Sequence, residues 1–119
     1  MKNEIILFKQ GDLTLEATVS PDKDTVWLSQ KQMEQLFEVK HATISEHISN
    51  ILNSGELDET SVGFSDKSTG GRKAKIYNLD MILSVGYRVN SKKGIVFRKW
   101  ANKVLKDYMI KGYVNFLKG

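Results

Sequence analysis

Residues 29–55 read SQKQMEQLFEVKHATISEHISNILNSG, and this stretch decides the expected fold. Ser29 and Gln32 fit a capping box, in which each side chain satisfies a free backbone N–H at a helix start. Apolar residues then follow at helical spacing: Met33, Leu36 and Phe37. A second run has one apolar face: Ile44, Ile48, Ile51 and Leu52. Gly55 is placed to end it. The stretch predicts two short helices joined by about three residues.

The sequence before this stretch predicts β-strands. Apolar and polar residues alternate over Leu13 to Ser20, which is typical of a strand with one buried face. Shorter strands are expected at Glu4 to Lys9 and at Thr25 to Leu28, with turns at 10–12 and 21–24. The N-terminal 28 residues therefore predict an antiparallel sheet.

The sequence after Gly55 predicts a hairpin and two more helices. Extended residues 62–65 and 72–77 flank Gly70-Gly71, which favours a β-hairpin with a basic return strand. Helix caps are expected at Asn78 and Ser91. The third helix would bury Ile82, Leu83, Gly86 and Val89. The fourth would end at Gly112 and present an apolar stripe: Phe97, Trp100, Ala101, Val104, Leu105 and Tyr108.

This order of elements predicts a single α+β domain over residues 1–119. It would comprise N-terminal strands at 1–28, a winged helix-turn-helix at 29–89, and a long C-terminal helix with a tail at 90–119. The alternative is a helical hairpin that only packs. Glu34 and Glu38 favour that alternative, because helix-turn-helix pairs usually have a small residue and a glycine at these positions.

Composition narrows the class of protein. The chain has 119 residues and no Cys, so disulfides and thiolate metal sites are excluded. Its longest apolar run is residues 5–8, too short for a membrane span or a signal peptide, so a cytoplasmic protein is expected. The formal charge is −6 over residues 1–60 and +10 over residues 61–119. This asymmetry favours a polyanionic partner.

The expected recognition helix, at about 41–53, leaves small and polar side chains on its outward face. The residues expected at base edges are Lys40, His41, Ala42, Ser45, Glu46 and Ser49, and Thr43 is expected nearer a phosphate. The set has one fixed positive charge, so the wing must assist. The hairpin at about 62–77 would contact phosphates through Arg72, Lys73 and Lys75.

Other candidate sites are weaker. The last helix has a basic face that predicts secondary phosphate contacts or, alternatively, an ordinary solvated surface: Lys92, Lys93, Arg98, Lys99, Lys103 and Lys106. His41 and His47 are spaced wrongly for a metal pair, and no third ligand is near. The sequence contains no nucleophile elbow or phosphate loop, so neither an enzyme nor a cofactor is expected.

Several segments resemble the RhuM-type virulence-protein family. They are TVWLSQKQMEQLF at 25–37, ISEHISNIL at 44–52 followed by SGELDETSV, and KIYNLDMILSVGYRVNSKKGIVFRKWANKVLKDYMIKG at 75–112. The resemblance covers nearly the whole chain, and YNLDMILSVGYRVNS is its most specific part. FRKWANKVL, at 97–105, is also similar to the end of the Bro-N domain of phage antirepressors. The resemblance implies a bacterial, virulence-associated or mobile-element protein with a DNA-binding domain.

Two hypotheses follow. The first is a transcriptional or mobile-element regulator that binds double-stranded DNA by occupancy and performs no chemistry. The alternative is an antirepressor-like interaction module whose basic last helix binds an acidic protein partner. A homodimer could form through the last helix, or the same residues could be buried within one chain: Tyr108, Ile110, Tyr113 and Phe116.

Overall fold

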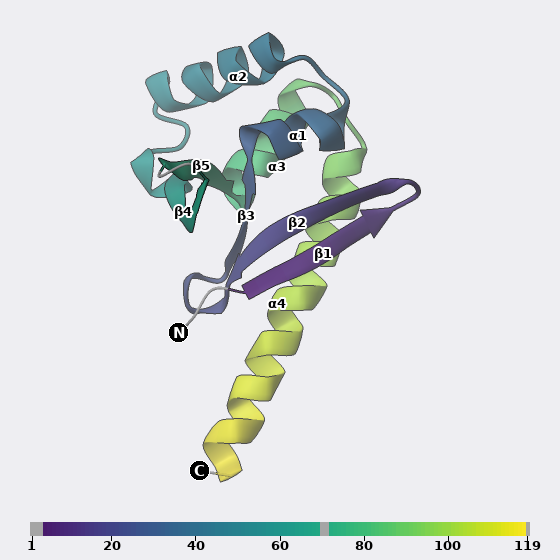
Figure 1. Ribbon diagram of the computed structural model, residues 1–119, viewed down its shortest axis with the longest axis vertical. Coiled ribbons are helices and arrows are strands. Elements are labelled where there is room, and N and C mark those ends of the chain that lie inside the picture. Colours follow the sequence, from purple (N-terminus) through teal and green to yellow (C-terminus); the bar gives the residue numbers. More distant parts are fainter. Residues whose placement is uncertain (1–3, 70–71, 119) are drawn as a thin grey trace.

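A computed structural model describes the backbone of residues 4–69 and 72–118 and the side chains of residues 4–65 and 74–108. The fold is α+β, as expected (Figure 1). A five-stranded antiparallel sheet has the order β1-β2-β3-β5-β4. Its strands are β1 (Glu4–Gln10), β2 (Leu13–Ser20), β3 (Thr25–Ser29), β4 (Val62–Thr69) and β5 (Arg72–Asn78). The helices are α1 (Gln30–Phe37), α2 (His41–Asn53), α3 (Leu79–Arg88) and α4 (Lys93–Lys118), with short 3-10 turns η1 (Pro21–Lys23) and η2 (Glu59–Ser61).

The N-terminal hairpin packs on α4. β1 and β2 pair from Glu4↔Val19 to Gln10↔Leu13 without a shift in register, so Phe8 and Leu15 lie opposite each other on the core face. The Phe8 ring meets those of Phe97 at 5.1 Å and Trp100 at 5.3 Å between centroids, both edge to face. Ala101 and Leu105 are also buried, and Val104 and Tyr108 pack against the core, so the predicted apolar stripe of the last helix is confirmed.

The centre of the sheet is fixed by Trp27 on β3. Its indole N–H donates to Ser20 Oγ at 2.9 Å, and the residue is 6% exposed. Gly63 on β4 lies against the same ring, because a Cβ at this position would come within 3.1 Å of it. This contact holds the base of the β4–β5 hairpin against β3.

The base of the hairpin is buried and its outer part is exposed. Ile76 and Tyr77 are both buried, on opposite faces of β5, whereas Ala74 and Lys75 are exposed. The alternation along β5 therefore determines which face of the sheet each side chain lies on. The distance of the residue from the core determines whether that side chain is buried. The tip residues Gly70 and Gly71 lie outside the described residues.

Two helix predictions need correction. α4 continues through Gly112 to Lys118 and does not end at Gly112. A glycine inside a helix costs about 1 kcal/mol but does not end it unless the chain turns there, and no proline follows. On α3 the buried residues are Met81, Ile82, Val85 and Gly86, whereas Leu83 is half-buried. Val89, just past the end of α3, is half-buried and packs against the core. The core-facing side of α3 is thus rotated relative to the prediction, and Leu83 lies at its border.

Candidate nucleic-acid interface

The turn between α1 and α2 has the expected length. Ser29 Oγ accepts from Gln32 N–H at 3.2 Å, and the Gln32 side chain accepts from Ser29 N–H at 2.9 Å, so the capping box is confirmed. Glu38 ends α1 in the left-handed region with φ 56°. α2 begins three residues later at His41. The turn position that usually carries a glycine therefore has a left-handed backbone conformation in this protein too, although the residue is a glutamate.

α2 presents one face to the core and the opposite face to solvent. Ile44, Ile48 and Ile51 are buried. The outward residues are exposed: Lys40, His41, Ala42, Glu46 and Ser49. Thr43 and Ser45 are half-buried. The described part of the chain therefore leaves the predicted recognition face open, as the isoleucine pattern requires.

Polar contacts fix the start of α2 against α1. Gln30 Nε2 donates to Ser45 Oγ at 2.7 Å and to the His41 carbonyl at 3.2 Å. His41 Nδ1 lies 2.7 Å from Glu34 Oε2, and the His41 side chain is 73% exposed. Glu34 therefore has a defined role at the turn, because its carboxylate orients an imidazole at the tip of α2. The Ser45 hydroxyl is partly engaged by Gln30, which leaves Ser49 the more accessible serine.

A groove of about 210 Å³ joins α2 to the β4–β5 hairpin. Its lining comes from α1, α2 and the hairpin: Gln30, Ser45, Ile48, Ser49, Leu52, Val62, Lys75 and Tyr77. The groove brings together three of the predicted contact residues, Ser45, Ser49 and Lys75. Arg72 and Lys73 are confirmed on β5, but their side chains lie outside the described residues.

Phe64 is a candidate contact that the sequence interpretation missed. It pairs with Lys75 across the hairpin, but it lines a hollow with Trp27, Gly63 and Ile76 and not the groove that Lys75 lines. Phe64 is 61% exposed, although an aromatic residue in a strand is usually buried. The sequence could have indicated Phe64 through its position in the expected strand 62–65, which pairs with the basic strand 72–77. Within the side chains that the structure describes, the hairpin therefore presents an exposed aromatic ring on β4 and an exposed lysine on β5.

Comparison with known proteins shows which family the chain belongs to. A model described as the Virulence protein RhuM family matches residues 57–116, half of the chain. The chain belongs to the RhuM virulence-protein family. The matched region begins after α2 and includes the hairpin, α3 and most of α4, so it is narrower than the resemblance drawn from the sequence. No curated protein and no solved structure matches the chain.

The basic face of α4 in this RhuM-family protein is separate from the groove beside α2. Five of its predicted phosphate contacts are exposed: Lys92, Arg98, Lys99, Lys103 and Lys106. Lys93 instead binds the Glu38 carboxylate through its ammonium group, and this hydrogen bond holds the pKa of Glu38 below its usual value. Figure 1 shows α4 running away from α2 along the length of the molecule. The structure therefore does not bring the α4 cations into the α2 groove.

The loop after α2 is tied to α3. Arg88 Nη2 donates to Glu56 Oε1 at 3.0 Å, and hydrogen bonds from Ser84 and Arg88 hold the pKa of Glu56 below its usual value. In the part of the chain that the structure describes, no group of three metal-ligating side chains comes together. None of the described helices combines the length and the apolar character that crossing a bilayer requires.

Proposed function

We propose that this RhuM-family domain binds duplex DNA as a winged helix-turn-helix and regulates transcription or a mobile element by occupying its site. The observation that carries the proposal is the open outer face of α2, continuous with a groove that leads to Lys75. The connectivity supports it, because α1 and α2 lie between β3 and β4, and the strands follow in the order β3-β5-β4. A mobile-element role would also agree with the resemblance of residues 97–105 to the end of the Bro-N domain, which was drawn from the sequence alone.

In this proposal α2 enters the major groove. Its outer face is made of small and polar side chains, so the helix can approach the base edges closely. Ser49 would hydrogen-bond to a base, and Glu46 would accept from the amino group of a cytosine. Lys40 and His41, which the sequence pattern placed at base edges, would instead lie near the phosphates, because they stand at the very start of α2. Because the face has little positive charge, it supplies selectivity more than affinity.

Affinity would come mainly from the hairpin. Arg72, Lys73 and Lys75 lie within four residues of β5 and would contact phosphates, which gives salt-sensitive binding. Phe64 would pack its ring on sugars or a base step of the neighbouring minor groove, as apolar wedges do in other minor-groove proteins. The hairpin would then contribute both charge and an apolar contact.

The test is a fluorescence-anisotropy titration of a labelled random duplex at 50 and 200 mM salt. Four phosphate contacts, from Lys40 and the three hairpin cations, predict a log–log slope of about −3.6 and a loss of roughly 150-fold in affinity over that range. Lys75→Glu should weaken binding at least tenfold and make the slope shallower by about one.

Lys9→Glu is the matched control. Lys9 is exposed on β1, at the opposite edge of the sheet from β4. Its replacement by Glu makes the same change of charge as Lys75→Glu. It should alter the affinity by no more than about twofold, as expected of a distant surface charge. Absent binding, salt-insensitive binding, or equal losses in Lys75→Glu and Lys9→Glu would refute the proposal. Phe64→Ala should weaken binding without changing the slope.

A further inference from the structure

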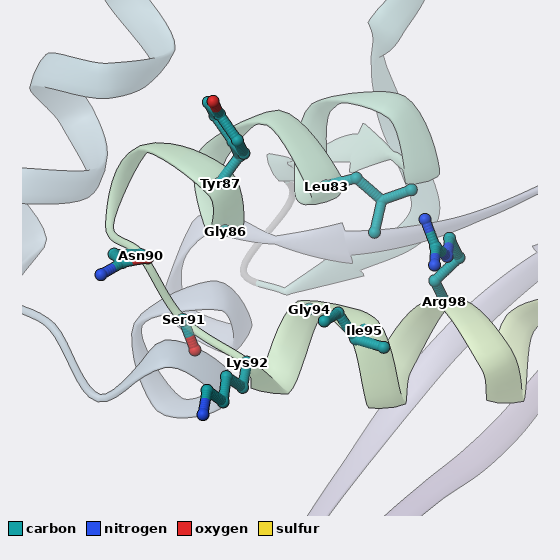
Figure 2. A pocket seen from close by; sticks show the side chains of 9 residues that line it. All are labelled: Leu83, Gly86, Tyr87, Asn90, Ser91, Lys92, Gly94, Ile95 and Arg98. Atoms are coloured by element: carbon teal, nitrogen blue, oxygen red, sulfur yellow. The ribbon is translucent and has the colours of Figure 1, made fainter.

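A second groove lies between α3 and α4, with a volume of about 260 Å³ (Figure 2). Its lining residues come from both helices and the connection between them: Leu83, Gly86, Tyr87, Asn90, Ser91, Lys92, Gly94, Ile95 and Arg98. Gly86 and Gly94 face each other, because a Cβ on Gly86 would lie 3.7 Å from the Cα of Gly94. The two helices are therefore close at this point, and the floor of the groove is largely backbone. None of these residues lines the groove beside α2.

The walls of this groove are apolar and open to solvent. Tyr87 is 88% exposed and Ile95 is 49% exposed, which places them among the most accessible large apolar residues that the structure describes. Leu83 is half-buried and projects from α3 toward α4 in Figure 2. A tyrosine ring and two aliphatic side chains held at the edge of a groove are typical of a protein-binding surface.

The charge around the groove has one sign. Lys92 and Arg98 flank Ile95 at three residues on either side, and both are exposed. In the described part of the chain neither makes an ion pair, and the lining contains no carboxylate. In Figure 2 Arg98 points from α4 toward Leu83, whereas Lys92, just before α4, points away from α3. The apolar middle of the groove is therefore bordered by one cationic residue at each end.

We propose that the α3–α4 groove binds an acidic segment of a partner protein. One aliphatic or aromatic side chain of that segment would lie between Leu83 and Ile95, and carboxylates on both sides of it would reach Lys92 and Arg98. Lys92 immediately precedes α4 and Arg98 lies on it, so the two cations are six residues apart, or about 9 Å along the helix axis. A helical partner would match this spacing with an acidic residue three positions before and three positions after the apolar one.

Two other occupants fit less well. A DNA backbone would neutralise the cations but would leave the apolar walls without a partner. In a second copy of this chain the required spacing occurs at Glu16, Val19 and Asp22, but Val19 is fully buried in β2. A shorter acidic stretch around an apolar residue is ELDE at 56–59. Its Leu57 packs against the protein's own core and its Glu56 binds Arg88, so that segment is already occupied. Charge and shape together therefore favour an acidic, amphipathic segment of another protein.

The test uses the full chain and a fluorescein-labelled 14-residue peptide in which one Leu has Glu three residues before and three residues after it. Binding is followed by anisotropy, and the site is located by amide chemical-shift changes at Ile95 and Tyr87. Arg98→Glu should weaken peptide binding about tenfold, because it replaces an attraction by a repulsion. A peptide with the Leu replaced by Ser should bind at least tenfold more weakly.

Lys103→Glu is the matched control, since Lys103 is an exposed cation of α4 outside the groove lining. It should change the peptide affinity no more than about twofold. Ile95→Ala provides a second variant without a charge change and should also weaken binding. The proposal is overturned if the peptide does not bind, or if Arg98→Glu and Lys103→Glu weaken it equally. It is also overturned if Arg98→Glu reduces affinity for duplex DNA more than for the peptide.

Discussion

The contact between α3 and Phe37 allows a pair of glycine substitutions to be predicted with opposite signs. A Cβ on Gly86 would come within 3.0 Å of both Cε1 and Cζ of Phe37, a ring that is only 5% exposed. Carbon atoms in good contact lie about 3.5–4.0 Å apart, so the ring or α3 must move by roughly 0.5 Å. Overpacking of this kind costs about 1–3 kcal/mol, and alanine regains about 1 kcal/mol of helix propensity over glycine. We expect Gly86→Ala to destabilise the fold by about 1 kcal/mol.

Gly94 is the internal control for this prediction. A Cβ there would lie 3.8 Å from Phe37 Cε1, which is an ordinary contact. Gly94→Ala should therefore be neutral or stabilising by up to about 1 kcal/mol. Urea unfolding followed by far-ultraviolet circular dichroism measures both variants. A Gly86→Ala variant as stable as Gly94→Ala would refute the packing argument. In a double-mutant cycle, Phe37→Leu should recover part of the stability that Gly86→Ala loses, since it replaces the clashing ring by a shorter side chain.

Three further predictions follow from local geometry. Ser29→Ala removes the hydroxyl that caps α1 and should cost about 1 kcal/mol of unfolding free energy in urea. Glu38→Gly should raise the thermal midpoint, because glycine adopts φ 56° without the penalty of a side chain. In 0.5 M salt the lost ion pair between the Glu38 and Lys93 side chains, which is exposed, should contribute little. An unchanged or lower midpoint would contradict this prediction. Burial and the Glu4 carboxylate raise the pKa of Tyr108 from 10.0 to about 12, so the preference for the neutral phenol stabilises the fold fully below pH 10 and is lost as the pH rises toward 12. Thermal melts at pH 8 and pH 11 should accordingly show a smaller alkaline loss for Tyr108→Phe than for the native chain, and equal losses would be the contrary result.

The parts of the fold that the sequence predicted well depend on residues close together in the chain. The capping box at Ser29, the cap at Asn78 and the glycine at Gly55 with φ +80° each act within one helical turn. The same local reasoning failed at Gly112, where α4 continues. A glycine permits a helix end without requiring one, and whether the helix continues depends on the rest of the chain.

The predictions for the candidate site also differ according to whether they depend on nearby or on distant residues. The outward residues of α2 were predictable, because the inward isoleucines determine the opposite face of a helix. The exposure of Phe64 was not, because it depends on how far the hairpin extends past the core. Glu34 looked unsuited to the turn in the sequence. Its partner His41 is seven residues away on another helix, and only the angle between α1 and α2 brings the two together.

The two proposals assign different polyanions to the two basic regions of the chain. A duplex on α2 and the hairpin uses Lys75 and its neighbours, whereas an acidic protein segment between α3 and α4 uses Lys92 and Arg98. The two grooves share no lining residue, so the two proposals place their ligands on different parts of the chain. If the α4 cations instead contacted the same duplex, Lys99, Lys103 and Lys106 would steepen the log–log salt slope by about 2.7 beyond the value of about −3.6 expected from four contacts. A slope near −3.6, unchanged when the peptide is bound, would therefore indicate that the domain can hold a protein partner while it remains on DNA.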